Sequence, residues 1–443
     1  MKSIVTPIIQ WILPDQVALK LNQEGPRRYF FHTSWNLAGR MLSLILAFFV
    51  SVYVIRYLGP SSWGLLSYVV SFTGIFAFVA SLGVDNILYV DLVNDPKRRD
   101  LYLGTAFGLK LIGGILAFVI TLAVSYFSGN SAYTNFLMAV VAAGFFFQPL
   151  NVVNTYFQAG VNSKPTVILS LAVNVCLSAL KIIFVNMGLT VGYFLLIYFI
   201  EAVLSAAGYL FIYRWFGLSV LQWRWANSAA KTIFTASWPL ILSSAFTFVY
   251  SRIDQVMIKQ LLNQTAVGLY DTGVRLAELW YIFPSIIIGS VFPAIINAKK
   301  NNFELFESRI TRLYFFSLCL ALGFIIPISV LSGFIIKLLY GTAFLPAAGV
   351  LKIYVWAGVS VTLATIVNQY LISEKLTRIS LYLNLFGMLL NIALNILFIP
   401  RYGIYGAAWA TLISYSLIPA GLVFFKSGRG QFRYMSRALR GKI

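Results

Sequence analysis

Nine ionisable side chains lie in the interior of the long apolar segments of this sequence, away from the segment ends. Each costs about 2.5–3.5 kcal/mol at the centre of a membrane-spanning helix, so the chain must place them against protein or water rather than lipid. We expect Lys181 and Glu201 to serve packing or to extend toward lipid headgroups. The nine comprise six basic and three acidic residues: Arg40, Lys110, Lys181, Glu201, Arg252, Asp254, Arg275, Glu278 and Lys352.

The arginines in this set favour an anionic ligand. Arg40 lies in the apolar segment 36–58, Arg252 in 232–258 and Arg275 in 268–296. A planar guanidinium group can bind a phosphate through paired hydrogen bonds. We therefore expect Arg40, Arg252 and Arg275 to line a cationic central cleft, with Lys110 and Lys352 as further members of this substrate-binding group.

Three carboxylates near these arginines permit two interpretations. Asp271 lies one helical turn before Arg275, Glu278 lies three residues after it, and Asp254 is two residues from Arg252. The carboxylates could pair with the arginines and hold helices together. Alternatively, a carboxylate within the membrane could carry a coupling ion, either H⁺ or Na⁺.

The composition identifies the elements that must position these residues. Of 443 residues, 60% are hydrophobic and 10% are charged, whereas a soluble domain carries about 25% charged residues. Twelve apolar blocks are each long enough to cross a bilayer. The sequence predicts an all-α polytopic membrane protein with twelve transmembrane helices. Two cysteines and one histidine do not form a metal cluster or a disulfide framework.

The positive charge is distributed unevenly between the two sides of the membrane. The net charge is +20, and most of the 33 basic residues share a side with the N-terminus. Such a bias places both termini in the cytoplasm, and it attracts anionic lipid headgroups. Because no base-stacking module accompanies the charge, we do not expect nucleic acid as a partner. The opposite side holds Arg56, Lys259, Lys337 and Arg401.

The sequence repeats itself half a chain apart. FHTSWNL begins at Phe31, and FTASWPL begins 203 residues later at Phe234. With six helices in each half, both halves start on the same side and form parallel repeats, a pattern typical of alternating-access transporters. Further matches are Gly64-Leu65 with Gly268-Leu269, Tyr156 with Tyr370, Ala179-Leu180 with Ala393-Leu394, and Gly192 with Gly406.

The predicted organisation follows from these helices and their connections. We expect two six-helix lobes, flanked and joined by segments on the cytoplasmic side. The five parts are an interfacial N-terminal segment (1–35), an N-lobe (36–213), an inter-lobe linker (214–231), a C-lobe (232–425) and a basic cytoplasmic tail (426–443).

Two groups of motifs carry a resemblance to a known family. The chain resembles O-antigen and polysaccharide repeat-unit flippases of the Wzx type, within the multidrug/oligosaccharidyl-lipid/polysaccharide exporter superfamily. The resemblance covers nearly the whole chain. The motifs that carry it are Val54-Ile55-Arg56-Tyr57-Leu58-Gly59-Pro60 with Trp63-Gly64-Leu65, then Asp254-Gln255-Val256-Met257-Ile258, Val267-Gly268-Leu269-Tyr270 and Phe292-Pro293.

The resemblance implies a flippase of the bacterial inner membrane. It would move an undecaprenyl-pyrophosphate-linked oligosaccharide from the inner to the outer leaflet by alternating access, during lipopolysaccharide biosynthesis. The cationic cleft would meet the pyrophosphate, and the membrane potential, with or without cation antiport, would drive export. Expected partners are the lipid-linked oligosaccharide, membrane lipids and a polysaccharide polymerase or ligase. The resemblance implies no cofactor.

Two alternative functions remain to be compared with this one. A multidrug or cation antiporter of the same superfamily would favour carboxylates in its cleft, whereas basic residues predominate within the spans here. A membrane enzyme would need catalytic residues in a large outer loop. The connection 332–345 is short and contains one ionisable residue, Lys337, so we expect no enzymatic activity.

Overall fold

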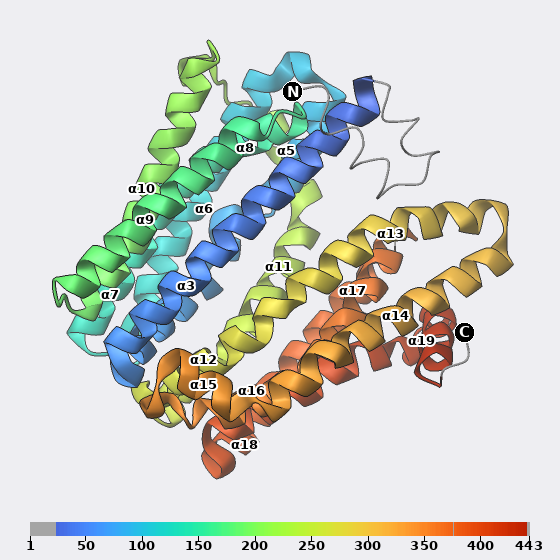
Figure 1. The fold of residues 1–443 in the computed structure, drawn as a ribbon. Coiled ribbons are helices and arrows are strands. Elements are labelled where there is room, and N and C mark those ends of the chain that lie inside the picture. The colour runs from blue at the N-terminus through green and yellow to red at the C-terminus, as the bar shows by residue number, and fades with distance from the viewer. Residues whose placement is uncertain (1–23, 375, 441–443) are drawn as a thin grey trace, which may run out of the picture.

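The computed structural model describes residues 24–374 and 376–440, and every regular element in these ranges is a helix (Figure 1). This agrees with the apolar composition, because a helix satisfies its own backbone hydrogen bonds inside a bilayer. The predicted all-α fold is confirmed. The predicted interfacial segment falls largely on residues 1–23, outside the described residues.

Six spans make up the first half of the described chain. The helix α3 contains the first span and the beginning of the second, which α4 and α5 complete. The fourth span is divided between α7 and α8. The bounds are α3 (Glu24–Ile75), α4 (Ala77–Ser81), α5 (Val84–Asn94), α6 (Arg99–Phe127), α7 (Ala132–Ala142), α8 (Val152–Ala159), α9 (Lys164–Asn186) and α10 (Val191–Trp215).

The second half repeats this arrangement and ends in a short additional helix. The span after α11 is divided between α12 and α13, the tenth between α16 and α17, and the last two lie in α18. The bounds are α11 (Asn227–Leu261), α12 (Gln264–Glu278), α13 (Ile282–Asn301), α14 (Phe303–Val330), α15 (Ser332–Tyr340), α16 (Ala347–Tyr354), α17 (Ala357–Ser373), α18 (Thr377–Ala420) and α19 (Arg429–Leu439).

Two glycines reverse the chain within α3 and α18. Gly59 has φ 68° and Gly403 has φ 61°, values that a residue without a Cβ adopts at little cost. Each of these elements is therefore two helices joined at a glycine. Ten stretches of the described chain are long and apolar enough to cross a membrane. Dividing the last of them at Gly403 and adding the 35-residue α11 gives the twelve predicted spans.

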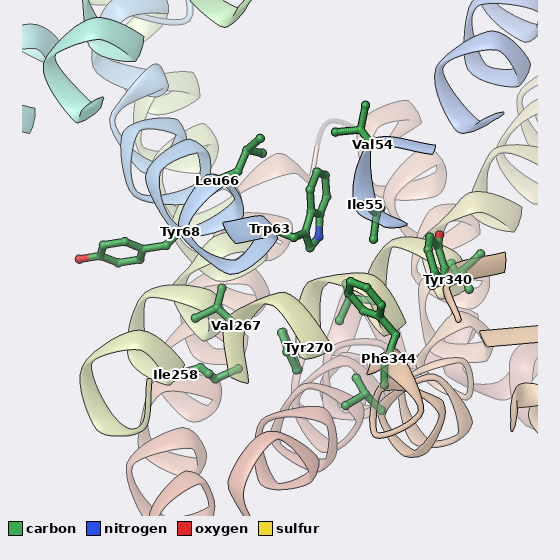
Figure 2. Packing of buried hydrophobic residues seen from close by; sticks show 14 of the residues in the cluster. Val54, Ile55, Trp63, Leu66, Tyr68, Ile258, Val267, Tyr270, Tyr340 and Phe344 are labelled. Atoms are coloured by element: carbon green, nitrogen blue, oxygen red, sulfur yellow. The ribbon is translucent and has the colours of Figure 1, made fainter. Parts of the chain in front are cut away.

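The helices form two groups that converge at one end. In Figure 1, α3 to α10 lie on one side and α12 to α19 on the other, with α11 running between them. The groups meet where α3 packs on α12 near α15, and the helix ends that carry the start of α3 and α19 are splayed apart. The buried core at the junction draws apolar side chains from both groups, as Figure 2 shows for Trp63, Val267 and Tyr270.

Two glycines matched by the sequence repeat form this junction. A Cβ on Gly64 would lie 1.8 Å from the carbonyl oxygen of Gln264, and one on Gly268 would lie 2.0 Å from that of Pro60. Gln264 Nε2 also donates to the carbonyl oxygen of Ser61 at 2.8 Å. Small residues allow helix backbones to approach this closely, so Gly64 and Gly268 close the end of the molecule opposite α19.

Replacing Gly64 with alanine is expected to open this junction. The added methyl group overlaps helix backbone rather than a movable side chain, and overpacking of this kind costs about 1–3 kcal/mol or more. With the exposed Cys176 and Cys319 replaced by serine, a cysteine at Ser67 should then react about tenfold faster with a membrane-impermeant maleimide. Gly323→Ala is the matched control, because open space surrounds that helical glycine. Equal labelling of the two variants would contradict a junction that depends on Gly64.

The connection between the halves lies against α6. The backbone N–H of Arg224 donates to the carbonyl oxygen of Asp100 at 3.0 Å, and a Cβ on Gly104 would meet the backbone of Arg224 at 2.5 Å. The Trp225 ring lies over Gly108 in the same manner. The next helix, α11, contributes Ile233 to a core cluster of the first half. The domain boundaries at 213, 231 and 425 stay predictions.

Candidate functional site

Charged residues from both lobes share one region between them. The helices α11 and α12 carry Arg252 and Arg275, and the charges of both act on Tyr198 of α10. The charge of Arg275 also acts on Lys181 of α9, and Lys181 acts on Glu201 of α10. Lys181 and Glu201 therefore lie within the electrostatic influence of the arginines, and their expected role in packing or toward lipid headgroups stays a prediction.

Arg252 has no ion-pair partner in the described part of the chain. No carboxylate oxygen described lies within 4.0 Å of its guanidinium nitrogens, and the side chain is half-buried. The neighbouring acid is Glu278, on which the charge of Arg252 acts and whose Oε1 accepts a hydrogen bond from the Tyr354 hydroxyl at 3.1 Å. The guanidinium of Arg252 is consequently available to a ligand anion.

Arg275 lies between an acid and an aromatic ring. Its Nε is 3.5 Å from Asp271 Oδ2, and its guanidinium carbon is 5.0 Å from the centroid of the Trp63 ring. The side chain still exposes 39% of its surface. Asp271 thus offsets part of the Arg275 charge, and part of the guanidinium side chain stays exposed.

Asp271 is the centre of a hydrogen-bond network that joins the lobes. Its Oδ2 accepts from Trp63 Nε1 at 2.9 Å and from Ser67 Oγ at 3.0 Å, and its Oδ1 accepts from Gln255 Nε2 at 2.9 Å. Gln255 Oε1 accepts in turn from Ser71 Oγ at 2.5 Å. Trp63, Ser67 and Ser71 belong to α3. Of the two interpretations of Asp271, pairing therefore has direct geometric support.

Asp254 occupies a separate polar pocket inside the C-lobe. It is 6% exposed, and its Oδ2 accepts from the Tyr270 and Thr411 hydroxyls, each at 2.6 Å. Its Oδ1 accepts from Asn395 Nδ2 at 2.6 Å, and that amide nitrogen lies 3.0 Å from Asn391 Oδ1. The Asn395 Oδ1 is buried without a hydrogen-bond partner in the described chain. Carboxylate, amide and hydroxyl oxygens are ligands suited to a small hard cation.

The remaining predicted cations lie away from the arginines. Lys110 is buried and forms an ion pair with Asp85 at 2.7 Å, on the wall of a cavity in the N-lobe. Lys352 is exposed along a groove beside Trp356 and Trp409. The side chain of Arg40 lies outside the described residues. The structure brings Arg252, Arg275, Glu278 and Asp271 together, whereas Lys110 and Lys352 line other hollows.

The cavity in the N-lobe was not anticipated from the sequence. It has a volume of about 530 Å³, within the range of about 300–1,000 Å³ usual for ligand pockets. Its polar lining includes Asp85, Lys110, Gln148, Asn151 and Glu201. The sequence did not identify the uncharged amides of Gln148 and Asn151, or those around Asp254, as candidate site residues, because the sequence analysis selected charged residues within the spans. No group of three or more His, Cys, Asp or Glu residues suited to a metal ion occurs among the described residues.

Comparison with known proteins identifies two overlapping sequence patterns. The pattern of the polysaccharide biosynthesis protein family matches residues 32–299, more than half of the chain. The pattern named MatE matches residues 239–397. A curated relative is the probable low-salt glycan biosynthesis flippase Agl15 of Haloferax volcanii, which is 27% identical over 189 residues. That match covers 42% of this chain and 40% of Agl15, so it spans less than half of the relative.

Two solved structures share the fold. An inward-facing multidrug resistance transporter of the MATE family superposes with a TM-score of 0.69 at 15% identity, covering 89% of this chain and 96% of the other. The lipid II flippase MurJ in an inward closed conformation gives 0.67 at 16% identity, covering 91% and 90%. At these identities the likeness establishes the fold, a two-lobe arrangement of transmembrane helices.

Proposed function

Because the chain belongs to the polysaccharide biosynthesis protein family, within the multidrug/oligosaccharidyl-lipid/polysaccharide exporter superfamily, we propose that it is a flippase for a lipid-linked oligosaccharide. The substrate is an oligosaccharide repeat unit on undecaprenyl diphosphate, moved from the inner to the outer leaflet of a bacterial inner membrane. Both termini lie in the cytoplasm, and the delivered unit serves O-antigen synthesis by a polymerase or ligase. The substrate leaves chemically unchanged.

The observation that carries the proposal is the pair of arginines between the lobes. Arg252 has no described ion-pair partner, and Arg275 keeps 39% of its side chain exposed. Two guanidinium groups present paired donors of the geometry that a diphosphate accepts. Their helices α11 and α12 pack on α3 of the opposite lobe, so an anion held by the two arginines would lie close to both lobes.

The physical task is to move a diphosphate through hydrocarbon. An ion without solvent or a counter-charge costs many kcal/mol in an apolar medium, and two fixed guanidinium groups in a hydrated cleft reduce this cost. The lipid tail remains in the bilayer at the gap between the lobes. With the cytoplasm negative, outward movement of negative charge gains about 2.3 kcal/mol per charge per 100 mV.

Asp254 is the best-supported residue for ion coupling. It is surrounded by hydroxyl and amide groups and has no described basic partner within 4.0 Å. Glu278 instead lies beside Arg252, and Asp271 is held by the interlobe network. We propose that H⁺ or Na⁺ binds at Asp254 and that α11 links this site to Arg252, two residues earlier.

The second candidate is a multidrug or cation antiporter. The MatE pattern over residues 239–397 favours it, and Glu201 and Glu278 would be its cation-binding groups. Arg252 and Arg275 disfavour an antiporter for cationic drugs, because their positive charges would repel a cationic drug from the region between the lobes.

A reconstituted transport assay tests the proposal. Purified protein is placed in liposomes that contain a fluorescent polyprenyl-diphosphate trisaccharide, and a membrane-impermeant glycosidase reports which leaflet holds the sugar. We expect an additional fraction of substrate to become accessible when protein is present. Efflux of ethidium without movement of the lipid-linked sugar would instead establish the antiporter.

A further inference from the structure

The N-lobe cavity adjoins the region that holds the two arginines. Its wall includes Tyr198 of α10 and Phe248 of α11. Phe248 lies one helical turn before Arg252 on α11, so the cavity wall and Arg252 are neighbours on one helix face. A ligand whose anionic end lies at the arginines can extend its other end past Tyr198 into the cavity.

The one cation that lines the cavity is paired with an acid. Lys110 Nζ lies 2.7 Å from Asp85 Oδ1, which neutralises the one buried cation of the lining. The other charged lining residue is Glu201, and the charge of Lys181 acts on it. Among the described residues, the cavity therefore has no unpaired cation that could bind an anionic group. The site at Arg252 differs, because Arg252 has no described ion-pair partner.

Several polar groups of the lining have no hydrogen-bond partner among residues 24–374 and 376–440. The Thr73 hydroxyl belongs to a residue that is 3% exposed, and it has no hydrogen bond in the described chain. The side-chain amides of Gln148 and Asn151 likewise form no hydrogen bond with another described residue. Each amide offers both donors and an acceptor, and the rings of Tyr198 and Phe248 supply flat apolar surfaces.

Amides, hydroxyls and aromatic rings together are the chemistry that recognises uncharged sugars. A sugar ring presents hydroxyl groups, which exchange hydrogen bonds with amides, and an apolar C–H face, which packs on an aromatic ring. A carboxylated sugar would place an unpaired negative charge in a cavity whose one lining cation is already paired with Asp85, which is unfavourable. We infer that the N-lobe cavity is a subsite for uncharged sugar residues of the glycan, whose diphosphate is held across the interface by Arg252 and Arg275.

This inference rests on the proposed function, and the test separates the two. Cys176 and Cys319 are replaced by serine, and Ser205→Cys places one thiol on the cavity wall. Ser416→Cys, in the groove of the C-lobe, is the control. Maleimide labelling is measured in the presence of each of three short-chain prenyl diphosphates. The first carries no sugar, the second carries a neutral trisaccharide, and the third carries the same trisaccharide with a terminal uronic acid.

The neutral trisaccharide lipid should slow labelling of Ser205→Cys about tenfold, whereas the sugar-free and acidic lipids should not, and Ser416→Cys should be unaffected by any of them. Binding of all three lipids without protection of Ser205→Cys would overturn the inference and leave the proposed function standing. Failure of all three lipids to bind would reject the proposed function itself. Equal protection by the neutral and acidic lipids would reject the preference for uncharged sugars.

A second measurement uses affinity rather than labelling. Gln148→Ala combined with Asn151→Ala should weaken binding of the neutral trisaccharide lipid about tenfold, to the affinity of the sugar-free lipid, and leave the latter unchanged. Gln158→Ala is the matched control, since this exposed glutamine of α8 does not line the cavity. An equal loss for both lipids would show general damage to the N-lobe and overturn the assignment.

Discussion

Replacing Arg252 with glutamate is expected to lower the translocation rate about a hundredfold, equivalent to about 2.7 kcal/mol. The change removes a charge-assisted hydrogen-bond donor, worth about 1.5–3 kcal/mol, and puts a like charge against the diphosphate. Arg252 has no described ion-pair partner to lose, so the effect should fall on transport rather than on folding. The rate is measured in liposomes, and surface glycan is measured in cells at matched protein levels.

Two further variants make this result interpretable. Arg252→Lys keeps the charge but loses the paired donors, and we expect an intermediate rate. Arg401→Glu changes the charge on an exposed residue in the helix-reversal region of α18 and should have little effect. Normal surface glycan with Arg252→Glu would remove this arginine from the binding site. Arg275→Glu is a less clear test, because it also disturbs Asp271 and Trp63.

Replacing Asp254 with asparagine is expected to abolish the dependence of transport on an imposed cation gradient. Asparagine fills the same space but carries no charge, so it provides no proton site and weakens any site for Na⁺. The gradient-driven increase in translocation should disappear, while the rate driven by membrane potential alone persists. Translocation is measured with a Na⁺ or H⁺ gradient at zero potential, together with uptake of radioactive Na⁺.

The control for this variant is Glu278→Gln, at the other candidate carboxylate. If Asp254 carries the ion, Glu278→Gln should retain the response to the gradient. Loss of the response in Glu278→Gln and its survival in Asp254→Asn would assign coupling to Glu278 instead. Asp254→Ala is less useful, because it leaves the Tyr270, Thr411 and Asn395 donors without their acceptor, and unsatisfied buried groups cost about 1–3 kcal/mol each.

The architecture could be predicted from the sequence because burial in lipid imposes strong constraints. Apolar length gave the spans, and one pair matched by the repeat, Gly64 and Gly268, lies together at the junction. The division of α3 and of α18 into two helices could also be predicted, because each of these elements covers two apolar blocks with a chain reversal between them.

The arrangement of the site could be predicted only in part. The proximity of Arg252, Arg275 and Glu278 could be predicted because these charges lie on consecutive helices, whereas their role in a cationic cleft stays a prediction. The ion pair between Lys110 and Asp85 was not expected, since sequence spacing does not fix how one helix is rotated against another. The amides of Asn391 and Asn395 were overlooked for a different reason, because an uncharged polar residue in a span serves packing as readily as binding.

The connection that lies on α6 has a consequence for the polypeptide itself. Hydrogen bonds and close glycine contacts attach residues 224–226 to the first half of the molecule, and α11 and α12 pack separately on α3, so contacts other than the peptide link to α11 also hold the halves together. If the gene is divided between codons 226 and 227, the fragments 1–226 and 227–443 should accordingly reassemble in the membrane. The linker peptide should then remain bound to α6 of the first half.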